Sequence, residues 1–110
     1  MPFDLQILFR NMDASPAAEA QVRRRAEELE EFSDRIETCR VILEVAQRQR
    51  RHGKLYQVHI DLAVPGRHVV VNRNHDDDHA HEDIYVAIRD SFDAARRQLQ
   101  DHMRRHDGSA

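Results

Sequence analysis

The recurrence of an apolar side chain at every second position in the middle of the chain constrains the fold more than any other feature. Every second residue is apolar through two stretches, Cys39–Val45 and Tyr56–Val64. Successive side chains of an extended strand point to opposite faces, so the pattern predicts two strands that each bury one face. A sheet built from such strands must be covered by other elements on that one face.

Two further strands are predicted beside these. Residues 3–10 alternate in the same way. The Pro-Gly pair at 65–66 predicts a tight turn, because proline fixes φ at the second turn position and glycine accepts a positive φ at the third. Val69–Val71 then predicts the return strand. The basic segment 47–54 (QRQRRHGK) is expected to form the loop between the two central strands.

Two amphipathic helices complete the pattern. The first is predicted to begin after Ser15, a preferred N-cap residue that precedes proline, and to run to about Phe32. Its apolar stripe at helical spacing is Ala18, Val22, Ala26 and Leu29. The second helix is expected from about Glu82 to Arg105, with Gly108 after its end. Its inward stripe is Ile84, Ile88, Ser91, Phe92, Ala95, Leu99 and His102.

The element order is therefore β-α-β-β-β-α, which places the chain in the α+β class. Strands with one apolar face and helices with one apolar stripe predict a four-stranded sheet with both helices packed on one face. The length of 110 residues fits a single domain, 1–110, with its core within about 3–105. Both helices would then expose their charged sides on the same side of the molecule.

Sequence motifs of catalysis are missing. The three glycines are isolated, so no phosphate-binding glycine loop can be written, and no Gly-x-Ser-x-Gly motif occurs. Cys39 is predicted to be a buried, inert thiol rather than a nucleophile. His59 and Asp61 share the outward strand face, which we interpret as a solvated surface rather than an acid–base pair. We expect no enzymatic activity, no cofactor and no small-molecule substrate.

The same sequence indicates a cytoplasmic protein without a membrane segment. A lone cysteine is typical of a reducing compartment. The first ten residues lack the basic leader and the unbroken apolar run of a signal peptide, and no apolar stretch reaches membrane-spanning length. No pattern indicates an oligomeric state.

An acidic, histidine-rich segment precedes the second helix. His75, His79 and His81 lie next to the run of carboxylates Asp76–Asp78, and both groups are ligands for zinc, nickel or copper. No cysteine or helical spacing supports such a site. The segment is therefore either a solvated acidic loop or a weak candidate for a divalent-metal site.

Positive charge is segregated from this acidic segment, although the formal net charge of the chain is -3. A negative protein does not fit indiscriminate coating of nucleic acid, which rests on phosphate neutralisation. Arginines on two helices of one face can nevertheless meet the phosphates of a folded RNA by shape. The alternative interpretation is ordinary solvated helix faces. The candidate residues are Arg23, Arg24 and Arg25 on the first helix, Arg48, Arg50, Arg51 and Lys54 in the loop between the central strands, and Arg89, Arg96, Arg97 and Arg104 on the second helix.

Three segments resemble the ribosome hibernation promoting factor and ribosome-associated inhibitor family. They are EDIYVAIRD at 82–90, ARRQL at 95–99, and LEEFSDR at 29–35. The last is similar to a Leu-x-x-Phe/Tyr-x-Asp-Arg step of that family. The element order matches as well, so the resemblance covers nearly all of residues 3–105.

The resemblance implies a fold similar to double-stranded RNA-binding domains and a translation inhibitor that acts in stressed cells. Family members bind the 30S ribosomal subunit and its rRNA at the decoding region, and the helices carry the basic residues. Carried over by position, the RNA-binding role falls to Arg89, Arg96, Arg97 and Arg104, and with less support to Arg23 and Arg24.

Three departures from the family keep an alternative open. The net charge is negative, lysine is almost absent, and the HDDDHAH segment at 75–81 is unfamiliar. The alternative is a diverged member of the same fold that acts as a metal-responsive or protein-interaction module. A continuous positive surface on the second helix would favour RNA binding, whereas neutralisation by Asp90, Asp93 and Asp101 would favour the alternative.

Overall fold

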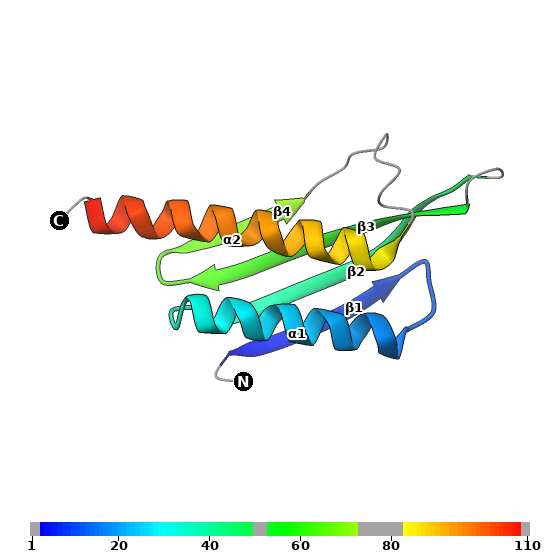
Figure 1. Cartoon of the computed structure of the whole chain (residues 1–110), viewed down its shortest axis with the longest axis horizontal. Coiled ribbons are helices and arrows are strands. Elements are labelled where there is room, and N and C mark those ends of the chain that lie inside the picture. The colour runs from blue at the N-terminus through cyan, green and yellow to red at the C-terminus, as the bar shows by residue number, and fades with distance from the viewer. Residues whose placement is uncertain (1–2, 50–52, 73–82, 109–110) are drawn as a thin grey trace.

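The computed structural model of the chain describes residues 3–49, 53–72 and 83–108. Its element order confirms the predicted β-α-β-β-β-α arrangement (Figure 1). The bounds are β1 Asp4–Arg10, α1 Pro16–Phe32, β2 Thr38–Gln49, β3 Gly53–Val64, β4 Arg67–Asn72 and α2 Ile84–Gly108.

The four strands form one mixed sheet in the order β1-β2-β3-β4. β1 and β2 are parallel, so α1 is the crossover between them, whereas β2, β3 and β4 pair antiparallel. The pairing places Leu5 beside Cys39, Cys39 beside Leu62 and Leu62 beside Val69. Since paired residues point to the same face, this row of apolar side chains crosses the whole sheet.

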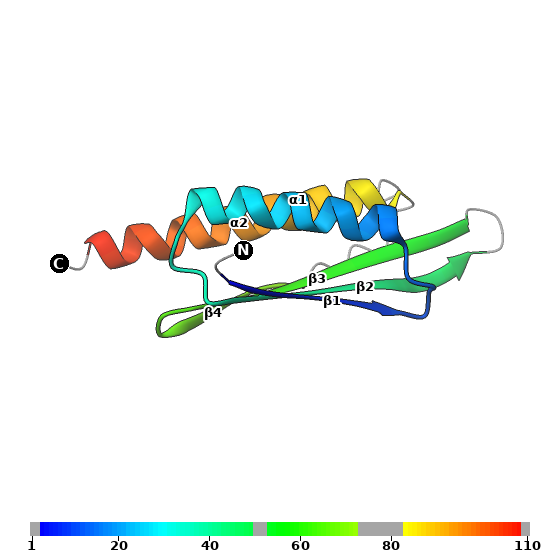
Figure 2. The ribbon, with the colours of Figure 1, turned by 90° about the horizontal axis from the view of Figure 1, so that it is seen from below.

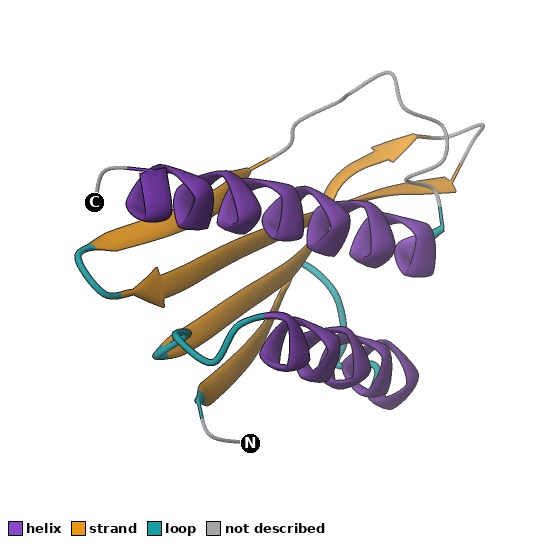
Figure 3. Cartoon of the chain, turned by 60° about the vertical axis from the view of Figure 1, so that its left-hand side comes forward, coloured by secondary structure: helices purple, strands orange, loops and turns teal. Residues whose placement is uncertain are grey.

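Both helices cover the face of the sheet to which this row points. Figure 2 shows α1 and α2 on one side of the sheet and no element on the other side of the described strands. α1 packs against β1 and α2, and α2 packs against β3 and β4. The two helices lie side by side (Figure 3). The predicted one-sided architecture is therefore confirmed.

The core lies between the helices and the sheet. The predicted stripe of α1 is buried in full, from Ala18 to Leu29. The stripe of α2 is buried from Ile88 onward, with Ile84 only partly buried, and Ala87 and Ala94 join it beyond the prediction. Ser91 and His102 are the polar members of the stripe, and the Ser91 hydroxyl donates a hydrogen bond to the backbone carbonyl of Val58 at 3.2 Å.

Side-chain caps fix where the helices begin. The Ser15 hydroxyl accepts a hydrogen bond from the backbone N–H of Ala18 at 3.2 Å, as an N-cap residue does. Asp83 does the same for α2, where its carboxylate accepts from the N–H of Tyr85 at 2.9 Å. These caps satisfy N–H groups that have no partner within the helix.

Two predicted boundaries were wrong. The expected loop 47–54 is mostly strand, because β2 continues to Gln49 and β3 begins at Gly53, with a register shift between Val45 and Gln47. Backbone hydrogen bonds extend the hairpin after side-chain alternation has ended, so alternation alone could not find these ends. α2 likewise continues through Gly108 rather than ending before it, because no residue breaks the helix in its last turns.

The packing of α2 makes a simple stability prediction. Leu99 is 1% exposed and its neighbour Gln100 is exposed. Leu99→Ala should lower the free energy of unfolding by about 2–5 kcal/mol, as core truncations do. Gln100→Ala is the matched control and should change it by less than about 0.5 kcal/mol. Urea unfolding followed by circular dichroism measures both, and similar losses would contradict the burial of this helix face.

Candidate nucleic-acid interface

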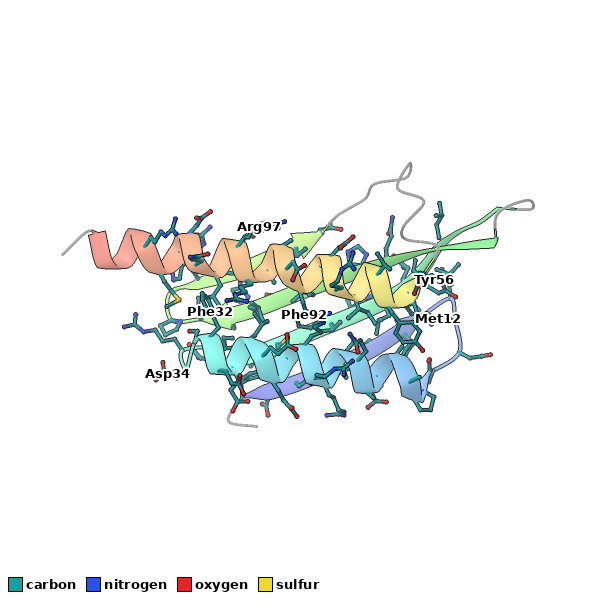
Figure 4. The ribbon with its side chains drawn as sticks, viewed as in Figure 1. Met12, Phe32, Asp34, Tyr56, Phe92 and Arg97 are labelled. Atoms are coloured by element: carbon teal, nitrogen blue, oxygen red, sulfur yellow. The ribbon has the colours of Figure 1, made fainter. Side chains whose placement is uncertain are left out.

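The outer side of α2 carries four exposed arginines. Arg89, Arg96, Arg97 and Arg104 are each exposed, and their spacing of seven, one and seven residues keeps them on one side of the helix. Arg97 and Arg104 lie opposite the buried stripe that holds α2 on the sheet, and Arg89 and Arg96 lie toward its flank. Figure 4 shows Arg97 on the side of α2 away from α1. The structure thus brings together the four candidate residues of the second helix on one solvent-facing surface, which we call the arginine face.

Neutralisation of the arginine face by its own carboxylates is partial. Arg89 forms an ion pair with Asp90 at 3.2 Å. Within the described ranges, Arg97 and Arg104 form no ion pair, and Asp93 forms none with Arg96. The positive charge of the arginine face is therefore reduced at the N-terminal end of α2, where Asp90 pairs with Arg89. Further along α2, the described carboxylates do not pair with the arginines.

Arg96 turns toward α1 rather than away from it. Its guanidinium lies over the ring of Phe32, 4.9 Å from the ring centroid. A shallow groove of about 80 Å³ runs between the helices here, lined by Arg25, Glu28, Leu29, Phe92, Asp93 and Arg96. Figure 4 places Phe32 and Phe92 between the two helices.

The arginines of α1 are held by residues of their own helix. Arg23 pairs with Glu19 at 2.9 Å, and Arg24 hydrogen-bonds the Gln21 side chain. Arg25 lies 3.4 Å from Glu28. Arg25 is the one that lines the groove, and Arg23 is two positions away along the helix and so on nearly the opposite side. The structure does not bring Arg23 together with the arginine face.

Sequence patterns miss the contact between Phe32 and Arg96. The sequence patterns predict that Phe32 ends the first helix and that Arg25 is one of several basic residues of that helix, but they give neither residue a partner. Phe32 follows Leu29 by three positions and so flanks the buried stripe, which is the one available signal. The contact joins two helices, and their relative rotation cannot be found from either pattern alone.

The opposite face of the sheet has a different character. It holds two contacts between a histidine and a carboxylate: Nε2 of His59 lies 3.3 Å from Glu44, and Nδ1 of His68 lies 2.8 Å from Asp61. His59 and Asp61 face outward as predicted. A hollow of about 180 Å³ lies among Arg40, Ile42, His59, Ile60, Asp61, Val70 and Asn72. We call this surface the open sheet face.

The candidate metal ligands His75, His79 and His81 lie outside the described residues. Within the described part of the chain, no group of three or more histidine, cysteine or acidic residues is placed to hold a metal ion. The described helices also include none long and apolar enough to span a membrane.

These features define a class of protein: a small α+β domain in which two helices cover one face of a four-stranded sheet and expose arginines on their outer side. Comparison with known proteins identifies the family. The model of the family described as Sigma 54 modulation protein / S30EA ribosomal protein matches residues 5–107. The chain therefore belongs to this family, as the sequence resemblance predicted. No curated protein sequence matches the chain.

Two solved structures share the fold. A structure described as a ribosomal subunit interface protein from Coxiella burnetii is 16% identical, with a TM-score of 0.71 over 92% of this chain and 98% of that one. The N-terminal domain of Protein Y from Thermus thermophilus is 20% identical, with a TM-score of 0.68 over 93% of this chain and 99% of that domain. At these identities the likeness concerns the fold.

The environment of Cys39 predicts an unreactive thiol. Burial, together with the nearby charge of Asp61, raises the pKa of Cys39 to about 12. At pH 8 only roughly one thiol in ten thousand would be ionised, and the thiolate is the reactive form. Ellman's reagent should therefore modify Cys39 slowly in the native protein and rapidly in urea. Equally fast modification without urea would contradict the burial of this strand position.

Proposed function

We propose that the chain is a ribosome-associated translation inhibitor that acts in the cytoplasm of stressed cells. In this proposal it binds the 30S ribosomal subunit through rRNA at the decoding region. The arginine face of α2 makes the principal contacts with rRNA phosphates. Binding blocks the subunit, and no catalytic step is involved.

The observation that carries the proposal is the set of exposed arginines on α2, three of which form no ion pair within the described chain. The guanidinium group has a planar set of N–H donors that matches phosphate oxygens, so such a helix suits an RNA backbone. The helix is anchored along its buried stripe, which holds the arginines at fixed spacing. A ribosomal partner is supported by family membership and by the similar fold of the Coxiella burnetii protein, which is described as a ribosomal subunit interface protein.

The distribution of charge supports shape-based binding rather than indiscriminate binding. α1 carries five glutamates and three arginines, and two of these arginines pair with glutamates of their own helix. In the proposal, α2 therefore contributes most of the affinity. Arg23 and Arg24 take a secondary part, and contact requires an RNA surface that meets α2 while avoiding the acids of α1.

The charge of α1 also favours a specific second candidate. A helix with an acidic excess beside a partly neutralised arginine face is a reasonable protein-interaction surface. In that case the chain would be a diverged family member without rRNA affinity. Sedimentation with purified 30S subunits separates the two candidates, because only the first predicts saturable binding to subunits stripped of bound factors.

Binding to 30S subunits should weaken steeply with salt, because it rests on arginine–phosphate contacts that release counterions. The double variant Arg96→Glu and Arg97→Glu should weaken binding at every salt concentration. It should also reduce the slope of log affinity against log salt by about 2, since each lost phosphate contact removes about 1. A titration of labelled protein with 30S subunits at several salt concentrations measures both effects.

The matched control is the double variant Arg10→Glu and Arg40→Glu. Both residues are exposed on the open sheet face, and the change in net charge is identical. The control should retain most of the affinity and the native salt slope. If the two double variants lose affinity equally, the effect is one of overall charge and the assignment to α2 is wrong.

A further inference from the structure

Among the residues that the structure describes, the stack of Arg96 on Phe32 is the one cation–π contact made by the arginine face. The guanidinium carbon lies 4.9 Å from the ring centroid, within the range of a cation–π interaction. Within the described residues, no other arginine is stacked in this way. Arg97, its neighbour along the chain, is exposed and has no such platform.

Phe32 is held firmly enough to act as a platform. It is the last residue of α1 and packs partly buried against the hydrophobic core. The turn that follows is closed by the backbone N–H of Ser33, which donates to the carbonyl of Leu29 at 2.9 Å. Ser33 is itself buried, and its hydroxyl accepts from the N–H of Arg35 at 3.3 Å. The ring therefore belongs to the core and not to a free surface loop.

Stacking on a ring fixes an arginine without using its hydrogen-bond donors. A guanidinium that stacks flat on a ring keeps the N–H groups at its edges for other partners. A free arginine loses rotamer freedom when it binds a phosphate, and an arginine held against a ring has already lost part of it. The contact with Phe32 thus positions the guanidinium of Arg96 beside the groove between the helices before any ligand binds.

We propose that Phe32 is a positioning residue for RNA binding, which holds Arg96 in the orientation that grips an rRNA phosphate. This inference rests on the proposed function. It assigns a role to a residue that does not itself contact RNA. The inference also predicts that Arg96 contributes more to the binding affinity than Arg97 does. Arg96→Gln should therefore lower the affinity more than Arg97→Gln, although both remove one exposed charge from the same helix.

The neighbouring residues of the groove favour Arg96 as the RNA contact over Arg25. The Nε atom of Arg25 is buried and has no hydrogen-bond partner in the structure, and its terminal nitrogen lies 3.4 Å from Glu28. Arg25 is thereby directed along α1 and partly covered. Arg96 crosses the groove above it and remains exposed.

The test is a double-mutant cycle with purified 30S subunits as the probe. Phe32→Leu should weaken binding about two- to fivefold, the affinity equivalent of part of the rotamer freedom that an unstacked arginine loses when it binds. In a chain that already carries Arg96→Gln, the same change should cause no further loss. Phe32→Met repeats the test with a second ring-free side chain, in case the leucine variant folds poorly. Phe32→Tyr keeps the ring and should retain native affinity.

The outcomes separate the inference from the proposed function. If Phe32→Leu weakens binding equally with and without Arg96, the ring acts only through the general structure and its positioning role is overturned. If the tyrosine variant loses affinity like the leucine variant, the stacking ring is not the cause. If Arg96→Gln alone leaves binding to 30S subunits unchanged, Arg96 is not an RNA contact and the inference is overturned, whereas the absence of any saturable binding by the native chain would overturn the proposed function. Thermal melts of every variant report the folded fraction.

Discussion

The rest of the structure depends on the burial of one face of the sheet. β2 and β3 present most of their apolar side chains to one side, and the row from Leu5 to Val69 continues that surface across all four strands. The parallel pairing of β1 with β2 requires a crossover, and α1 is that crossover. α2 then covers β3 and β4 on the same face. The outer sides of two helices distant in sequence thereby become one surface.

That surface explains how a chain with a formal net charge of -3 can carry a positive patch. Electrostatic recognition at short range depends on which charges share a surface, because salt screens charges further apart than about 8–10 Å. Glutamates of α1 pair with two of its three arginines, and Asp90 pairs with Arg89. The positive part is therefore narrow: Arg96, Arg97 and Arg104 along α2. A narrow strip of this kind suits one docking geometry on a folded RNA rather than general adhesion to nucleic acid.

Most of the fold could be predicted from the sequence because its signals are local. Alternation assigned the inward faces of β2 and β3, and the spacing of Ala18 to Leu29 assigned that of α1. The ends of the hairpin could not be predicted, since backbone pairing past Val45 leaves no side-chain pattern. The exposure of the arginines on α2 followed from its buried stripe. Their partners did not, because Phe32 reaches Arg96 only through the packing of two helices whose mutual rotation is set by the whole core.

The proposed function requires that RNA meets the helix layer and not the open sheet face. The most direct measurement is site-specific photo-cross-linking to purified 30S subunits from two surface positions. Gln100 lies on the exposed side of α2 among the arginines, and Val70, 53% exposed, lies on the open sheet face. We expect rRNA cross-links from a photoreactive residue at position 100 and few from position 70. Cross-links to rRNA mainly from position 70 would contradict RNA binding by the helix layer.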